Sequence, residues 1–259
     1  MIVDLEEALR NRLGRGGRCF VPYVTGGAPG VDAELLGSLR DAGADALEVG
    51  IPFSDPVMDG GVIQEASRVA LEAGARPADV LSTVAKADLD IPVAVMTYAN
   101  PVRRLGFDEF LERSVEAGVS GFIVPDLPVD EATEWVERCR TRNAATIFLA
   151  APGSSAERLR AIAAEARGFV YCVSTYGVTG ARESLAGTAR DVVTALRPLT
   201  DRPLLVGVGI GDPPQAAEAC GFADGVIVGS ALMARLMEGD RSGAVDLCAT
   251  FRAAIPTGA

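Results

Sequence analysis

Short apolar runs alternate with amphipathic stretches along the chain, and the alternation repeats eight times after an opening helix expected at about Leu5 to Leu13. The runs are rich in β-branched residues and apolar on both faces, which is typical of parallel strands covered on both sides. The strands are expected at Cys19–Thr25, Ala46–Gly50, Pro92–Thr97, Gly121–Pro125, Ala145–Ala150, Gly168–Val173, Leu204–Gly207 and Gly225–Val228. Eight such strand–helix units predict an α/β fold, a (β/α)8 TIM barrel with an extra N-terminal helix.

The amphipathic stretches have recognisable ends. In VDAELLGSLRDAG, Asp32 is expected in the first helical turn and Gly43 is able to close the helix in the left-handed conformation. Asp212 followed by two prolines is typical of another helix start. An open doubly wound sheet is the alternative, but the turn after the first strand, VTGGAPG, lacks the Gly-x-Gly-x-x-Gly pattern of such sheets. No linker-like segment divides the chain, so residues 1–259 are expected to form one barrel domain.

Two acidic residues near the second strand are candidates for catalysis. Glu48 lies inside the apolar run, and Asp59 follows on a proline-stiffened loop. A carboxylate is costly to bury, so it must be paired, protonated or used, and two acids indicate acid–base chemistry. The other reading is a structural glutamate bonded to backbone amides and an ordinary turn aspartate. Barrel active sites lie at the C-terminal ends of strands, which favours catalysis. The same mouth is expected to hold Tyr98, Asn100 and Asp126.

The amino-acid composition excludes several kinds of partner and catalytic mechanism. The chain has 24 basic and 35 acidic side chains, a net charge of −11, which argues against nucleic acid or an anionic membrane as its partner. It has no histidine, which excludes Ser-His-Asp and Cys-His hydrolases and histidine-ligated metal sites, so no metal is expected. The single lysine, Lys86, lies in a polar stretch that predicts a solvated helix end, which disfavours Schiff-base chemistry. Carboxylates and backbone groups are therefore expected to carry the chemistry.

The five cysteines are scattered and form no Cys-x-x-Cys motif, which indicates reduced thiols. The N-terminus lacks the pattern of a signal peptide, and no apolar run reaches the length of a membrane helix. These features predict a cytoplasmic protein.

Three glycine-rich turns follow the last three expected strands, at residues 177–180, 207–211 and 229–230. Glycine lets a backbone approach a ligand closely, and Gly229-Ser230 is expected to open a helix whose N-terminus attracts anions. Each turn alone reads as an ordinary tight connection. Together, after strands seven and eight of a barrel, they predict a phosphate site made of backbone amides.

Seven motifs, from about Phe20 to Met233, resemble the tryptophan synthase alpha subunit family. They are FVPYVTGG, LEVGIPFSDPVMDG, MTYANP, VPDLPVDE, VSTYGVTGAR, GVGIGDPPQ and ADGVIVGSAL. The resemblance implies a cofactor-free retro-aldol cleavage of indole-3-glycerol phosphate into indole and glyceraldehyde 3-phosphate. It implies that Glu48 and Asp59 are the catalytic pair. Glu48 would protonate the indole ring at C3 and Asp59 would accept a hydrogen bond from the indole N–H, which requires that their pKa values differ.

The same resemblance implies the remaining site residues. The phosphate would be held by Gly180, Gly209, Gly229 and Ser230. Tyr23 and Tyr98 would wall the indole pocket with Met96 and Ile123, and Tyr171 would lie beside the substrate. Thr179 would lie on a loop that closes over the mouth and positions Asp59.

The family's usual partner is a pyridoxal-phosphate-dependent beta subunit, which would face Asp55, Pro56 and the segment MTYANPVRR. Gly61 stands where many relatives have proline, and this flexible residue would loosen the loop. Three alternatives stay open: another phosphate-binding barrel enzyme, an inactive alpha-like regulatory subunit, and a free-standing indole-3-glycerol-phosphate lyase of another pathway. Retention of both Glu48 and Asp59 counts against the inactive subunit.

Overall fold

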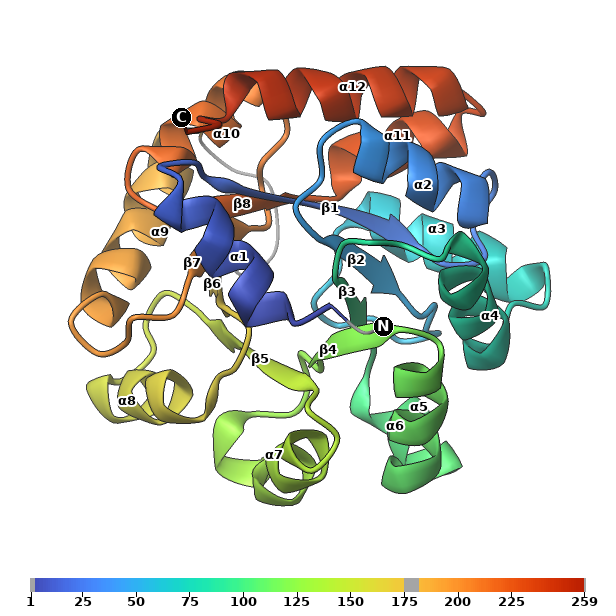
Figure 1. Cartoon of the computed structure of the whole chain (residues 1–259), viewed down its shortest axis with the longest axis horizontal. Helices are drawn as coiled ribbons and strands as arrows, with labels where there is room; N and C mark the ends of the chain where they lie inside the picture. Colours follow the sequence, from blue (N-terminus) through green and yellow to red (C-terminus); the bar gives the residue numbers. More distant parts are fainter. Residues whose placement is uncertain (1–2, 175–181, 259) are drawn as a thin grey trace.

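The computed structural model describes residues 3–174 and 182–258, and within these ranges eight parallel strands close into a barrel in chain order (Figure 1). The strands are β1 (Cys19–Thr25), β2 (Leu47–Gly50), β3 (Val93–Met96), β4 (Val119–Ile123), β5 (Ala145–Ala150), β6 (Val170–Val173), β7 (Leu204–Gly207) and β8 (Gly225–Val228). The predicted (β/α)8 barrel is confirmed. That residues 1–259 form a single domain stays a prediction.

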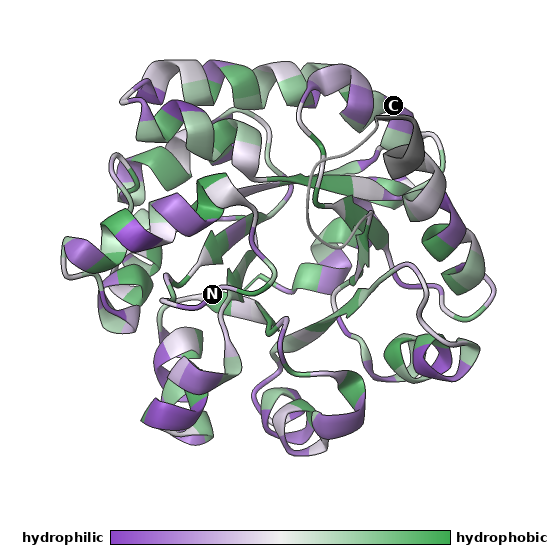
Figure 2. Cartoon of the chain, turned by 180° about the vertical axis from the view of Figure 1, so that it is seen from behind, coloured by the Kyte–Doolittle hydropathy of each residue, from purple (hydrophilic) through white to green (hydrophobic). Residues whose placement is uncertain are grey.

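Helices surround the barrel, and their apolar stripes face the strands (Figure 2). They are α1 (Leu5–Gly14), α2 (Ala33–Asp41), α3 (Gly61–Glu72), α4 (Pro77–Ala87), α5 (Ala99–Leu105), α6 (Phe107–Glu116), the 3-10 turn η1 (Val129–Glu131), α7 (Thr133–Arg140), α8 (Ala156–Glu165), α9 (Arg182–Leu196), α10 (Pro213–Cys220), α11 (Ser230–Met237) and α12 (Arg241–Ala254). Lys86 is exposed in the last turn of α4, as its polar surroundings predicted.

The element boundaries follow the predictions closely, with two instructive differences. β4 begins two residues before the expected Gly121, because Val119 already pairs with Val93 of β3; Ser120 then forms an irregularity before the pair Ala94–Gly121. The buried Ser120 hydroxyl donates to the Val93 carbonyl at 3.2 Å, so this polar residue fits inside the sheet. Asp32 is not in the first turn of α2 but precedes it as the N-cap, where its carboxylate accepts from the Leu35 N–H at 2.9 Å.

The end of the barrel at which the strands begin is closed by α1 and by a largely buried ion pair. Leu5 and Leu9 of α1 are buried in the core. Arg252 of α12 contacts the Asp45 carboxylate at 2.9 Å and also donates to carbonyl groups of the C-terminal segment, Ile255 and Pro256. These contacts tie the first and last helices to the barrel, and they lie opposite the end where barrel chemistry occurs.

Arg252→Met is expected to lower the free energy of unfolding by about 3 kcal/mol, because it leaves buried acceptors and part of the Asp45 charge unpaired. Arg12 lies 3.3 Å from Asp45 and would still pair with it in the variant. The expected loss of unfolding free energy is therefore at the lower end of the range for breaking a buried ion pair. Urea unfolding would measure it, with Arg140→Met as the control, since that arginine pairs with Glu137 on the surface and should cost less than about 1 kcal/mol. Equal losses in the two variants would contradict the structural role of Arg252.

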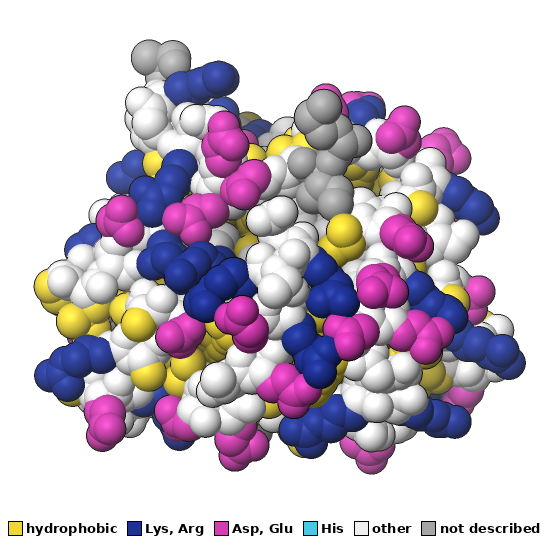
Figure 3. All heavy atoms as spheres, turned by 60° about the horizontal axis from the view of Figure 1, so that its bottom comes forward, with side chains coloured by type: hydrophobic (Ala, Val, Ile, Leu, Met, Phe, Trp, Pro, Cys, Tyr) yellow, Lys and Arg dark blue, Asp and Glu magenta, His cyan; other side chains and the backbone are white. Residues whose placement is uncertain are grey.

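The surface carries mixed charge. On the face drawn in Figure 3, basic and acidic side chains are interspersed. Across the structure, ion pairs such as Arg138–Glu134 and Arg158–Asp130 join exposed side chains of opposite charge. All five cysteines are buried free thiols, in agreement with the prediction of reduced cysteines. Among the described residues, no helix combines the length and apolar character that a membrane span requires.

Candidate active site

Glu48 is a buried acid with an unused carboxyl oxygen. It is the second residue of β2, pairs with Tyr23 of β1 in the sheet register, and is only 1% exposed. Within the described part of the chain its Oε2 atom has no hydrogen-bond partner. Burial, and second the nearby Asp59 carboxylate, raise the pKa of Glu48 to about 8. Glu48 is therefore protonated at neutral pH and able to donate that proton to a ligand.

Asp59 lies on the loop between β2 and α3, and several contacts hold this loop against the barrel. The Gln64 side-chain amide donates to the Asp59 carbonyl oxygen at 2.9 Å. The Met58 N–H donates to the Tyr98 hydroxyl at 3.2 Å. Burial raises the pKa of Asp59 to about 6, and a hydrogen bond with Tyr98 acts in the opposite direction. Asp59 is consequently ionised at neutral pH while Glu48 is not.

This difference between two neighbouring acids is the pattern that general acid–base catalysis requires. Glu48 lies within the barrel and loses most of its hydration, whereas Asp59 is only partly buried and has a hydrogen-bonding neighbour. The order of the two pKa values agrees with the expectation that one acid starts protonated and the other ionised. The site is thus able to donate a proton at one point and stabilise positive charge at another.

Two tyrosines lie inside the barrel beside these acids. A Cβ atom built on Gly50 would lie 2.2 Å from the Tyr23 hydroxyl oxygen, and one on Gly207 would lie 2.2 Å from that of Tyr171. Each ring therefore packs against a strand glycine, at a position where any larger residue would clash with the tyrosine. Burial first, and then the nearby carboxylates, raise the pKa of each tyrosine well above 10, so both remain neutral. Both tyrosines lie near Glu48 and Asp59, and their contact with the substrate stays a prediction.

Tyr98, which was expected in the wall of the indole pocket, contacts Phe53 and the loop that carries Asp59. Its ring stacks on Phe53 with the centroids 4.9 Å apart, and its hydroxyl contacts the loop that carries Asp59. Asp126, which was expected at the same mouth, accepts from the Ala99 N–H at 2.8 Å at the start of α5. Its contact in the structure is thus to a helix end.

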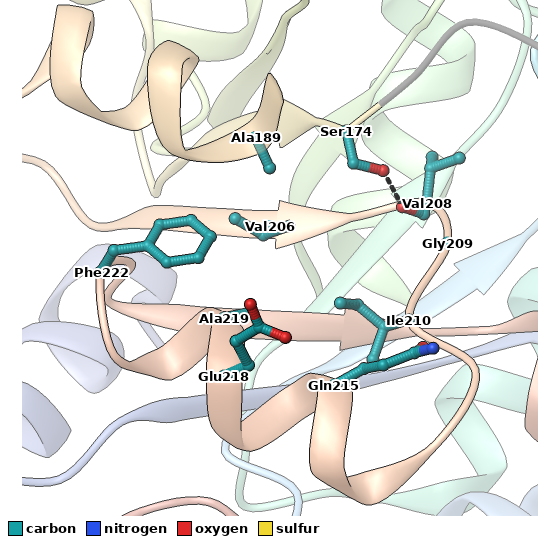
Figure 4. Close-up of a pocket in the computed structure, with 10 residues that line it drawn as sticks. All are labelled: Ser174, Ala189, Val206, Val208, Gly209, Ile210, Gln215, Glu218, Ala219 and Phe222. Carbon is teal, nitrogen blue, oxygen red and sulfur yellow. Dashed lines mark hydrogen bonds between the residues drawn. The ribbon is translucent and has the colours of Figure 1, made fainter. Parts of the chain in front are cut away.

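The loop after β7 is held in an unusual backbone conformation. Val208 has a φ of +66° and Gly209 a φ of +93°. The Gly211 N–H donates to the Gln215 side chain at 2.7 Å, while the Gly209 N–H has no partner among the described residues. A small pocket of about 50 Å³ lies beside this loop, over β7 and between α9 and α10 (Figure 4).

Ser230 is the first residue of α11, so that this helix presents its unpaired N–H groups directly after β8, as predicted. The predicted residues Thr179 and Gly180 lie outside the described residues. Gly61 is the first residue of α3. The loop just before it is held by the hydrogen bond from the Gln64 side chain to the Asp59 carbonyl. Sequence reasoning missed Gln64 and Phe53; the position of Gln64 in the first turns after a catalytic loop was the available signal.

A closed eight-stranded barrel with two carboxylic acids near the C-terminal end of β2 has the architecture of a (β/α)8-barrel enzyme.

Comparisons with known proteins narrow this class. Residues 9–253 match the family model described as tryptophan synthase alpha chain. The chain is 48% identical to the tryptophan synthase alpha chain of Streptomyces coelicolor over 84% of this chain and 79% of the relative. It is 42% identical to that of Synechococcus elongatus over 98% and 96%. A solved structure of Mycobacterium tuberculosis tryptophan synthase is similar with a TM-score of 0.91 at 38% identity, covering 100% of both chains.

The chain belongs to the tryptophan synthase alpha chain family. It is accordingly an enzyme, a carbon–carbon lyase of tryptophan biosynthesis.

Proposed function

We propose that Glu48 and Asp59 are the residues with which this chain cleaves indole-3-glycerol phosphate into indole and glyceraldehyde 3-phosphate. The observation that carries this assignment is the buried Glu48 carboxyl, whose pKa is raised to about 8 and whose Oε2 has no partner in the described structure. A structural glutamate would use both oxygens, because an unpaired buried polar atom destabilises a fold. The alternative reading of Glu48 as a structural residue is therefore disfavoured.

In the first step, protonated Glu48 gives its proton to C3 of the indole ring. C3 becomes tetrahedral, and the positive charge moves to the ring nitrogen. Ionised Asp59 accepts a hydrogen bond from the indole N–H and stabilises that charge. The pKa of about 6 leaves Asp59 negative at neutral pH, as this role requires.

In the second step, the glycerol hydroxyl on the carbon attached to C3 loses its proton to the Glu48 carboxylate or to a water. The oxygen forms a carbonyl, the C–C bond breaks, and its electron pair returns to the ring. Indole leaves with the new hydrogen at C3, and the aldehyde leaves as glyceraldehyde 3-phosphate. When Glu48 takes the hydroxyl proton, it regains its starting state without a metal or an organic cofactor.

The remaining site residues bind and orient the substrate. Gly209, Gly229 and Ser230 supply N–H groups to the phosphate, with the N-terminus of α11 adding partial positive charge. We propose the same role for Gly180 and a loop-closing role for Thr179. Tyr23, Tyr98 and Tyr171, two of them against strand glycines, form the wall beside the indole ring.

A beta subunit is the proposed partner, and the loop after β2 is the proposed contact. Asp55 is exposed on this loop, Pro56 follows it, and the Val57 side chain is 75% exposed. Binding there would bury Val57 and act directly on the loop that carries Asp59. We place the reaction in the cytoplasm, which suits a chain with five free thiols.

The test is indole release from indole-3-glycerol phosphate by the purified chain, with and without an added beta subunit. We expect weak release alone and a strong increase with the partner, because partner contact with the Asp59 loop would order the site. High release alone with no response would indicate a free-standing lyase. No release in either condition would contradict the proposed catalytic roles and favour an inactive regulatory subunit.

A further inference from the structure

We propose that Ser174 is a positioning residue that directs the Gly209 N–H toward the substrate phosphate by holding the Val208 carbonyl. This inference rests on the proposed role of Gly209 in phosphate binding. It gives a role to Ser174, a residue of the motif VSTYGVTGAR to which the sequence analysis assigned none, directly after β6.

Val208 has a conformation that its own side chain opposes. A φ of +66° places it in the left-handed region, where a β-branched residue is rarely found because its Cβ substituents crowd the backbone. The side chain is also 40% exposed, so core packing does not explain the conformation. Contacts of the neighbouring backbone must therefore stabilise it.

Ser174 provides such a contact. It directly follows β6, is 3% exposed, and its hydroxyl donates to the Val208 carbonyl oxygen (Figure 4). The Ser174 carbonyl in turn accepts a hydrogen bond from the Thr188 hydroxyl on α9. The Ser174 backbone is thus hydrogen-bonded to α9, while its side chain is hydrogen-bonded to the loop after β7.

The hydrogen bond to the Val208 carbonyl oxygen also fixes the direction of the Gly209 N–H group, which belongs to the same peptide. The Val208–Gly209 peptide is trans, and in a trans peptide the N–H points opposite to the carbonyl. The carbonyl points toward Ser174 on the β6 side of β7, so the Gly209 N–H points toward the β8 side. There Ser230 starts α11 with its own free N–H groups.

The other end of the same loop is also held. The Gly211 N–H is bonded to Gln215 at 2.7 Å, so the segment between Val208 and Gly211 is constrained at both ends. Loss of the Ser174 hydroxyl would release Val208 to a negative φ, and this change would rotate the peptide that carries the Gly209 N–H away from the phosphate.

Ser174→Ala tests the inference. We expect it to raise about tenfold both the KM for indole-3-glycerol phosphate and the inhibition constant of inorganic phosphate, the value of one charge-assisted hydrogen bond. We expect kcat to change by less than about threefold, since Glu48 and Asp59 are untouched. In a Val208→Gly background the same serine substitution should change phosphate affinity by less than about threefold, because glycine adopts positive φ without support.

Ser114→Ala is the matched control. Ser114 is a fully buried serine whose hydroxyl donates to the Phe110 carbonyl at 2.7 Å within α6, away from the site, so phosphate affinity should be unchanged. Unchanged phosphate affinity in Ser174→Ala would overturn the inference, as would an equal loss in the Val208→Gly background. A parent chain that neither cleaves the substrate nor binds inorganic phosphate would instead overturn the proposed function and the inference together.

Discussion

Glu48→Gln is expected to lower kcat for indole release about a thousandfold while the affinity for inorganic phosphate stays within a few-fold. Glutamine has nearly the same shape and fits the same buried position in β2, but it has no proton to give to C3 of the indole. Losses of this size are typical when a general acid is removed. The measurement is single-turnover indole release, together with inhibition by inorganic phosphate.

The stability of the same variant separates a catalytic role from a structural one. The pKa of Glu48 rises from 4.5 to about 8 on folding, so the folded protein retains a proton that the unfolded chain loses between these values. The unfolding free energy of the wild type must therefore fall as the pH rises through that window. The Glu48→Gln variant does not lose this stability, because its side chain does not ionise. Glu48→Gln should exceed the wild type in unfolding free energy, by roughly 2–3 kcal/mol near pH 7 and less near pH 5. A less stable variant that no longer binds phosphate would mean that Glu48 is structural.

Asp59→Asn is expected to lower kcat about a hundredfold and to change the shape of the pH profile. The wild type should show a bell-shaped dependence of kcat/KM. Activity falls below about pH 6, where Asp59 becomes protonated, and above about pH 8, where Glu48 loses its proton. The asparagine variant should lose the acidic limb. Its alkaline limb should move to lower pH, because the Asp59 charge contributes to the raised pKa of Glu48.

Residual indole release measured across the pH range would check this prediction. Glu65→Gln is a suitable control, because Glu65 is an exposed residue of α3 that pairs with Arg68 on the surface. Its profile should match that of the wild type. An Asp59→Asn profile with both limbs in place would show that Asp59 is not the group that titrates near pH 6.

Much of the site was predictable because its signals are local. A glutamate inside an apolar strand can be recognised from a few neighbouring residues, and the strand number places it at the active end of the barrel. The same holds for Ser230, which follows a strand and opens a helix.

The contacts that tune the site join residues far apart in the chain. The hydroxyl of Tyr98 meets the Met58 N–H forty positions away, and that of Ser174 reaches Val208 thirty-four positions away. In GVGIG, local preference would assign positive φ to glycines alone, yet Val208 adopts it as well as Gly209. No local pattern predicts this, because the contact that opposes the strain comes from the neighbouring strand.

The residues alone are enough to predict eight buried strands, the barrel they form and the acids at its mouth, because period, polarity and glycine placement act over short distances. The ionisation of those acids depends on closure of the barrel. Burial of Glu48 and its proximity to Asp59 arise only when β2, its following loop and the opposite strands come together. Desolvation and charge–charge interaction depend on distances in space, so the folded barrel decides which acid carries the proton.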